Sequence, residues 1–315
     1  MKSIKRLKFI AIFIALVTLN ILGCKKDRTN DVTNPDTTSL QQLSKDDAQF
    51  QASDDQITND ANDVLSETSM AQIKAVEDSL PGNCSITMDT INDTLRINMA
   101  YSGPNNANTF IRNGTVIIKK RFGAKWQNAG TAVSYTYLNL AVTKVSSGKQ
   151  FTFNGTRIWT DVTGGLIKNL NGGTTTIEHQ ITGAIKITFD NGTTETWNIS
   201  RTTTWSGVYP SALSITVGGT GSVDGYSNLM EYGTNRNGEI FYTQINTPIL
   251  YSEGCGWNPI WGVIVHQLPN VTKSATITYG YNSSDAIVAQ GSCADNYRMD
   301  WNIKGTTGTI YLPIP

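Results

Sequence analysis

The stretch IKITFDNGTTETWNISRTTTW, residues 185–205, decides the class of fold. Apolar and polar side chains alternate on both sides of Asn191-Gly192. Alternation with a period of two places the two sets of side chains on opposite faces of a β-strand. An Asn-Gly pair between two such runs is a strong signal for a hairpin, because both turn residues must accept a positive φ. We therefore expect two antiparallel strands joined by a tight turn at Asn191-Gly192.

The same two signals recur across most of the chain. Further Asn-Gly pairs begin at Asn113, Asn154, Asn171 and Asn237. Strand-like runs cover residues 115–121, 156–161, 174–181, 239–245, 260–268, 275–279 and 299–303. Thr, Asn and Gly are abundant and Leu is sparse, a bias that suits strands and turns. The sequence predicts an all-β, antiparallel, hairpin-rich domain over residues 81–315, arranged as a sandwich or barrel or as an open meander.

An acidic segment precedes this β region at residues 44–80. Asp47 follows Ser44 by three residues, as in a helix N-cap signal. The apolar residues of residues 57–65 share one helical face: Ile57, Ala61, Val64 and Leu65. We expect one or two amphipathic helices over residues 45–66. A disordered acidic linker is the alternative, because isolated helices of this length are marginal in water.

The N-terminus has the features of an export signal. A basic start is followed by an apolar run, Phe9–Leu19, which is too short for a transmembrane helix. The next motif, Ile21-Leu22-Gly23-Cys24, resembles the lipobox of bacterial lipoproteins. The resemblance implies that residues 1–23 are a signal peptide and that Cys24 receives a diacylglycerol and an acyl chain. Several acyl chains on one residue give durable anchoring to a membrane.

The residues after Cys24 bear on the location of the protein. Residues 24–43 are rich in polar residues, so we expect a flexible tether there. Lys25 stands where the retention signal for the inner membrane has Asp, which implies an outer-membrane lipoprotein on the periplasmic face or the cell surface. Lys25-Lys26-Asp27 also resembles the short export signal of Bacteroidota surface lipoproteins.

Charge and composition disfavour several classes of function. The 25 basic and 25 acidic residues cancel, so no overall field attracts nucleic acid. The two histidines, His179 and His266, are far apart, and the sequence has no His-Glu-x-x-His motif or zinc-type cysteine spacing. We therefore expect no metal, no cofactor and no catalytic residue that the sequence alone identifies. A glycosidase would need two carboxylates that face one cleft.

One strand carries a candidate binding face. Trp197, Arg201 and Trp205 lie on the same side of the run 197–205. An arginine between two indoles could form cation–π contacts, and the three side chains could make a platform for stacking sugars. The competing interpretation is a core face, and it is favoured because Trp is highly buried on average.

The cysteines suggest one disulfide. Cys84, Cys255 and Cys293 remain after Cys24, and an oxidising compartment permits disulfides. We expect Cys255 to pair with Cys293, because both lie in one C-terminal unit, and Cys84 to be free. Cys84 with either partner is the alternative, because sequence does not determine connectivity.

Four short motifs resemble the O-glycosylation sequon of exported Bacteroidota proteins, in which Ser or Thr follows Asp. The candidate acceptors are Thr37, Ser79, Thr90 and Thr94. Chance in a Thr-rich chain is the competing explanation.

The order of these elements resembles uncharacterised envelope lipoproteins of Bacteroidota. The shared features are the lipobox, the acidic helical segment, Cys84 at the start of the β region, Arg201-Thr202-Thr203-Thr204-Trp205 and Cys293-Ala294-Asp295-Asn296. Members of that family have a further cysteine near the position of Ser102, and its absence here would leave Cys84 without a partner. The resemblance implies a location and an all-β domain, but no activity.

Together these features favour a non-enzymatic envelope or cell-surface module, anchored by lipid, that binds glycan or an envelope protein or has a structural role. The alternative is a carbohydrate-active hydrolase. A cleft lined by two carboxylates would support the hydrolase, whereas an aromatic-decorated sheet would support binding.

Overall fold

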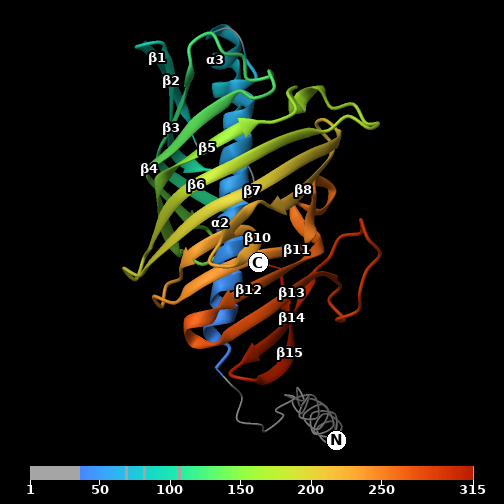
Figure 1. Ribbon diagram of the computed structural model, residues 1–315. Helices are drawn as coiled ribbons and strands as arrows, with labels where there is room; N and C mark the ends of the chain where they lie inside the picture. Colours follow the sequence, from blue (N-terminus) through green and yellow to red (C-terminus); the bar gives the residue numbers. More distant parts are fainter. Residues whose placement is uncertain (1–35, 68–69, 81–82, 106–107, 315) are drawn as a thin grey trace, which may run out of the picture. The chain divides into compact units, whose positions relative to one another are not determined.

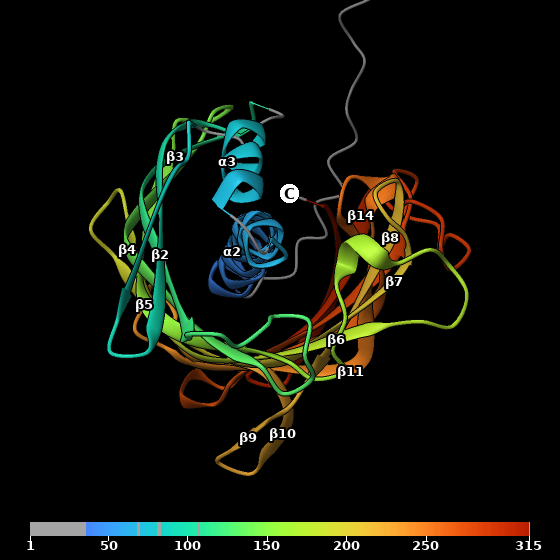
Figure 2. The same cartoon turned by 90° about the horizontal axis from the view of Figure 1, so that it is seen from above.

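The computed structural model describes residues 36–67, 70–80, 83–105 and 108–314. The predicted signal peptide and Cys24 lie outside these residues. The described part is a 15-stranded antiparallel sheet that curves around one long helix, α2, Thr38–Leu65 (Figures 1 and 2). A shorter helix, α3, Met70–Ser79, follows it. The unit Thr37–Pro315 contains the whole described core, as expected of a domain that folds independently.

Most strands pair with their neighbours in the chain, as in a meander. Their bounds are β1 Ser85–Ile91, β2 Thr94–Pro104, β3 Phe110–Arg121, β4 Ala132–Lys144, β5 Gln150–Asp161, β6 Ile177–Phe189, β7 Thr194–Val208, β8 Ala212–Gly219, β9 Gly221–Val223, β10 Tyr226–Thr234, β11 Ile240–Ser252, β12 Asn258–Leu268, β13 Lys273–Tyr281, β14 Asn296–Ile303 and β15 Thr306–Pro313. The predicted antiparallel all-β fold is thereby confirmed. Within the described residues β1 and β15 do not pair with each other, so the sheet is an open meander, rather than a sandwich or a closed barrel.

Two short strands, β8 and β10, share the position in the sheet between β7 and β11. β10 pairs with the first part of β7, and β8 pairs with its second part. The same two strands pair with β11 on the other side. The hairpin of β9 and β10 projects from the convex side of the sheet (Figure 2).

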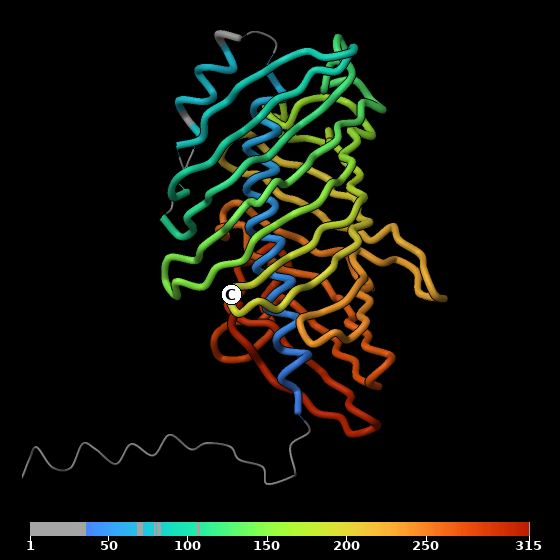
Figure 3. The backbone as a smooth tube through the Cα atoms, turned by 90° about the vertical axis from the view of Figure 1, so that its left-hand side faces the viewer, coloured from blue at the N-terminus to red at the C-terminus, as the bar shows by residue number. Residues whose placement is uncertain are grey.

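Helix α2 runs along the trough of the sheet (Figure 3). Its first turns contact the last strands, where Lys273 Nζ donates a hydrogen bond to Ser39 Oγ at 2.7 Å. Its last turns contact the first strands, where Tyr101 donates to Asp60 Oδ2 at 3.0 Å. The helix therefore joins the two ends of an open sheet.

Apolar burial explains why this helix is ordered. Its buried apolar residues are Leu40, Leu43, Phe50, Ile57, Ala61, Val64 and Leu65. The Phe50 ring packs against Phe153 and Trp197, with centroid separations of 5.1 and 4.5 Å. Such packing supplies the stability that an isolated helix lacks, so the disordered alternative is wrong. The helix begins at Thr38 and not at residue 45, because Leu40 and Leu43 extend the buried stripe into the predicted tether.

The hairpin between β6 and β7 is confirmed, but its turn differs from the expected one. Gly192 adopts a φ of +81°, whereas Asn191 does not adopt a positive φ. The Gly192 amide donates to the Phe189 carbonyl at 2.9 Å. This geometry is a turn centred on Asp190 and Asn191 that is followed by a left-handed glycine, a longer loop than the two-residue turn.

Two Asn-Gly pairs lie inside strands and not in turns. Gly114 in β3 and Gly155 in β5 have φ values of +130° and +145°. A Cβ atom on Gly155 would lie 2.4 Å from the Ala184 carbonyl oxygen of the neighbouring strand. These glycines mark close approaches between strands, for which the local sequence signal is the same as for a turn.

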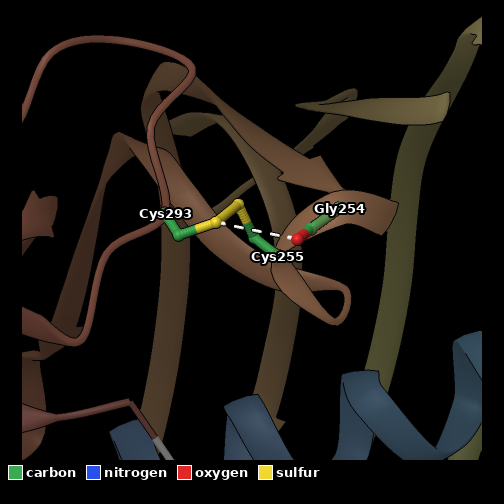
Figure 4. Close-up of a disulfide and its surroundings, with 3 residues drawn as sticks. All are labelled: Gly254, Cys255 and Cys293. Atoms are coloured by element: carbon green, nitrogen blue, oxygen red, sulfur yellow. Dashed lines mark hydrogen bonds between the residues drawn. A yellow bond between two sulfur atoms is a disulfide. The ribbon is translucent and has the colours of Figure 1, made fainter.

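The disulfide joins the turn after β11 to the loop before β14 (Figure 4). Cys255 and Cys293 are bonded, with a Cα–Cα distance of 5.2 Å. Cys84 is buried and free. The expected pairing is therefore confirmed, and the alternative that involves Cys84 is wrong.

Candidate ligand site beside the central helix

The acidic face of α2 points into the sheet and meets arginines there. Asp54 Oδ2 accepts hydrogen bonds from Arg157 Nη1 of β5 at 2.6 Å and from Arg201 Nη2 of β7 at 3.1 Å. Asp54 Oδ1 accepts a further bond from the Tyr137 hydroxyl of β4. The Arg157 guanidinium also lies over the Tyr135 ring, 4.9 Å from its centroid. The Asp54 carboxylate, which would be solvated on an isolated helix, thus binds α2 to the strands of the sheet.

Two further ion pairs flank this centre. Arg112 Nη1 donates to Asp60 Oδ2 at 2.6 Å, towards the end of the helix. Arg236 Nε donates to Asp46 Oδ2 at 2.6 Å, near its start. Burial raises the pKa of both carboxyls, and the guanidinium beside each opposes that rise.

A carboxyl pair lies between these links. Asp47 of α2 and Glu231 of β10 lie close together, because the Gln51 side-chain amide bridges their carboxyl groups. The Gln51 side-chain amide donates to Asp47 at 2.7 Å and to Glu231 at 3.2 Å, and its oxygen accepts from the Tyr251 hydroxyl at 2.7 Å. Burial raises the pKa of Asp47 to about 6 and holds that of Glu231 well above its usual range. Two buried carboxyls in contact cannot both ionise easily, so the pair retains a proton at neutral pH.

A cavity of about 100 Å³ opens beside this pair. The helix contributes polar residues to its lining: Asp47, Gln51, Asp55, Gln56 and Asn59. The sheet side contributes aromatic residues: Tyr251, Trp257 and Tyr279. The Asp55 side chain is 27% exposed, so the buried network reaches solvent here. Burial raises the pKa of Asp55 to about 6, against the effect of Arg201, whose Nη2 lies 3.0 Å from it.

The disulfide supports one wall of the cavity. Trp257 follows Cys255 by two residues and adopts a φ of +61°. Its ring packs edge-on against Trp205, with 5.8 Å between the centroids. The crosslink to Cys293 therefore restrains the turn that carries Trp257.

The geometry of the two acids suits binding better than hydrolysis. Asp47 and Asp55 both lie on α2, about 12 Å apart along the helix axis at a rise of ~1.5 Å per residue. A glycosidase instead needs two carboxyls that flank the scissile bond, whereas these two belong to the same wall of the cavity. Asp55 is also engaged by Arg201. Carboxylate and amide oxygens next to aromatic rings can instead accept hydrogen bonds from a ligand and cover its apolar side.

The aromatic face predicted from the sequence lies inside the molecule. Trp197 and Arg201 are 0% exposed, and Trp205 is 5% exposed. Their strand turns this row towards α2, where Arg201 pairs with Asp54 and Asp55. The row is a core face, and the proposed sugar platform is wrong as an external surface. Trp205 reaches the candidate site only through its contact with Trp257.

The residues that line the cavity were not identified as a site from the sequence, and two partial signals were available. Trp257 follows Cys255 by two residues, so the disulfide lies next to an aromatic residue. Asp47 and Asp55 belong to an acidic helix whose apolar stripe is thin. That thin stripe was the available sign that the acids also face the protein interior.

The other residues singled out in the sequence do not gather at this cavity. Thr90 is exposed in β1 and Thr94 is half-buried in β2, on either side of the first hairpin turn. Thr37 precedes α2 and its hydroxyl accepts a bond from the Gln41 amide, while Ser79 ends α3.

The two histidines do not line this cavity either. His179 and His266 are buried, and burial lowers their pKa values to about 3 and about 4. Among the described residues, no group of three His, Cys, Asp or Glu side chains is placed to hold a metal ion. The helices in that same part of the chain are too short or too polar to span a membrane. Cys24 lies outside the described residues.

No protein-family model, curated protein sequence or solved structure matches the chain.

Proposed function

We propose that this chain is a lipid-anchored envelope protein that binds a glycan end group in the cavity beside α2 and does not change it chemically. The observation that carries the proposal is that Asp55 and Trp257 line one cavity. A carboxylate and an indole on opposite walls can hold a hydroxylated group from two sides. The disulfide that restrains Trp257 suits the oxidising compartment in which such a protein would act.

The anchoring part of the proposal rests on Ile21-Leu22-Gly23-Cys24. Lipid on Cys24 would leave residues 25–37 as the connection to α2. We place the protein at the outer membrane, on its periplasmic face or at the cell surface.

The size of the cavity limits what can enter it. A volume of about 100 Å³ lies below the roughly 300–1,000 Å³ that is usual for small-molecule sites. One substituent of a sugar ring, such as a hydroxymethyl or acetamido group, suits a cavity of this size. The ring itself would then lie at the mouth, near the half-buried Trp257.

A carbohydrate-active hydrolase is the second candidate function. It is favoured by the presence of two acids, Asp47 and Asp55, whose pKa values burial raises to about 6, in one cavity. Their separation along the helix and the engagement of Asp55 by Arg201 favour binding. Release of reducing sugar from a bound glycan would decide for the hydrolase.

A glycan array probed with residues 25–315 tests the proposal, because this fragment contains the whole compact unit. We expect a defined set of glycans to bind. Asp55→Asn and Trp257→Ala should weaken binding roughly tenfold or more, as expected for the loss of a charge-assisted hydrogen bond or a stacking contact.

Two matched variants control for general effects. Asp190→Asn changes an exposed acid in a turn, and Tyr226→Ala removes an aromatic ring from the projecting hairpin. Both should bind like the unaltered fragment. The proposal fails if no glycan binds, or if the cavity variants fold normally and bind as well as these controls.

A further inference from the structure

A lysine faces the apolar interior of the sheet near the end of α2. In β3, Val116 and Ile118 are 0% exposed and face the trough. Side chains alternate between the two faces of a strand, so Lys120 belongs to the same inward row and Lys119 to the outward row. Leu95 of β2 lies directly opposite Lys120 in the register of the sheet.

Lys120 lines a second cavity, of about 350 Å³. This volume falls in the range of roughly 300–1,000 Å³ that is usual for small-molecule sites. Most of the lining is apolar and comes from α2, α3, β1, β2 and the segment after β3: Leu65, Ile73, Met88, Leu95, Ile97 and Trp126. The Trp126 indole nitrogen already donates to Asn62 at 3.0 Å, so it presents its ring to the space.

Within the described part of the chain, the positive charge of Lys120 has no partner of opposite sign. No carboxylate among the residues that the structure describes forms an ion pair with it, and its ammonium group donates to the Ala124 carbonyl. Glu67 also lines the cavity, but Lys168 neutralises it at 2.8 Å. Lys125 adds a second positive charge at the exposed side of the lining. Burial lowers the pKa of Lys120, which an anion beside it would reverse.

We propose that this cavity binds an aliphatic monocarboxylate, with its carboxylate at Lys120 and its hydrocarbon chain among the apolar side chains. The head group would receive the charge-assisted hydrogen bonds that Lys120 now gives to a backbone carbonyl. Binding would remove the apolar surface of the ligand's hydrocarbon chain, and that of the cavity, from water. Phe122, which lines the cavity and is 57% exposed, would be covered at the same time. This site shares no residue with the cavity beside Asp55 and does not depend on the glycan proposal.

Titration of residues 25–315 with dodecanoate, followed by calorimetry below the micellar concentration, tests the proposal. Dodecanoate should bind with 1:1 stoichiometry. Dodecyltrimethylammonium has the same chain with a positive head group and should bind at least tenfold more weakly. Equal affinity for the two head groups would overturn the role of Lys120.

Variants then locate the site. Lys120→Gln should weaken dodecanoate binding at least tenfold and leave the cationic probe unaffected. Lys119→Gln is the matched control, because its side chain is the exposed neighbour on the same strand, and it should bind dodecanoate normally. Equal effects of the two substitutions would refute the assignment.

A second variant tests the cavity itself without touching the charge. Met88 is half-buried in β1, and Met88→Trp should fill part of the space and weaken binding of both probes. Unaltered dodecanoate affinity in this variant, with an unchanged melting temperature, would place the ligand elsewhere. If Lys120→Gln does not fold, the head-group comparison and Met88→Trp still decide the proposal.

Discussion

Arg157 Nη1 lies 2.6 Å from Asp54 Oδ2, and the side chains of the two residues are 3% and 0% exposed. The pair connects α2 to β5 across 103 residues of sequence. Apolar contacts are not directional, so they alone would allow the helix to rotate or slide in the trough. A buried charge that must meet its partner permits one register, and Arg201 strengthens that requirement by binding the same carboxylate.

Asp54→Asn should therefore destabilise the domain strongly. Removing one partner of a buried ion pair leaves an uncompensated charge, which costs about 3–5 kcal/mol. Here Arg157 loses its carboxylate partner, and Arg201 keeps only Asp55. Urea unfolding of residues 25–315 measures the effect, with the exposed Asp190→Asn as a control expected within about 0.5 kcal/mol of the parent. A loss below about 1 kcal/mol for Asp54→Asn would show that the pair does not hold the helix.

The stability of the domain should fall as the pH rises from 6.5 to 8. Burial raises the pKa of Glu195 to about 8. The negative charge of Asp46 raises this pKa further, and Arg236 opposes the rise. A carboxyl with a raised pKa in the folded state keeps its proton there while the unfolded chain has lost it, so folding becomes less favourable as the pH rises through this window.

Other buried titratable groups also make the free energy of unfolding depend on pH. Glu231 shifts in the same direction as Glu195. His179 and His266, with pKa values lowered to about 3 and 4 in the folded state, oppose the trend below about pH 7.5, where the unfolded histidines still bind protons. The free energy of unfolding, measured in urea at several pH values, should show a negative slope of up to about 1.4 kcal/mol per pH unit for each proton involved. Glu195→Gln should flatten it, and an identical slope in this variant would assign the effect to another group.

Gly192→Val should destabilise the hairpin of β6 and β7 by about 1–2 kcal/mol, because an L-residue in the left-handed region is strained. No atom lies within 4 Å of a Cβ placed on Gly192, so the cost comes from its φ of +81° and not from a clash. Gly192→Asn is the matched control and should cost less, since Asn tolerates this region. Thermal unfolding compares the two, and equal melting temperatures for Val and Asn would contradict the reasoning.

The double substitution Cys255→Ser, Cys293→Ser should lower the free energy of unfolding by about 4 kcal/mol, from the chain entropy of a loop with a sequence separation of 38. It should also weaken glycan binding, because the turn that carries Trp257 loses its restraint. Cys84 should resist alkylation in the folded protein, since it is buried and burial raises its pKa to about 12. Rapid modification of native Cys84 would show that this region opens.

Cys24→Ser should block lipidation and leave unprocessed precursor, because the sulfur accepts the diacylglycerol that must precede cleavage of a lipoprotein signal. Metabolic labelling with a fatty acid and partition into detergent measure both steps in the producing cells. Cys84→Ser is the control and should mature normally. A Cys24→Ser protein that matures and partitions like the parent would exclude a lipoprotein.

Local patterns in the sequence predicted several of the strands, such as β7, β12 and β13, and favoured the helix and the disulfide. Alternation in residues 185–205 reflects which face of a strand is buried, and this is a property of neighbouring residues. Cys255 and Cys293 lie in one unit, so their pairing needed only a short meander to bring them together. The turn at Gly192 and the close approach between strands at Gly155 carry the same Asn-Gly signal, and only the neighbouring strand distinguishes them.

The destination of the acids on α2 was decided by the tertiary structure. The sequence shows an acidic helix, and its periodicity is the same whether that face meets water or meets Arg157 and Arg201. The arginines lie on strands far along the chain, and the register of the sheet brings them under the helix. The cavity between Asp55 and Trp257, and the open trough that holds the helix, arise from that same long-range pairing.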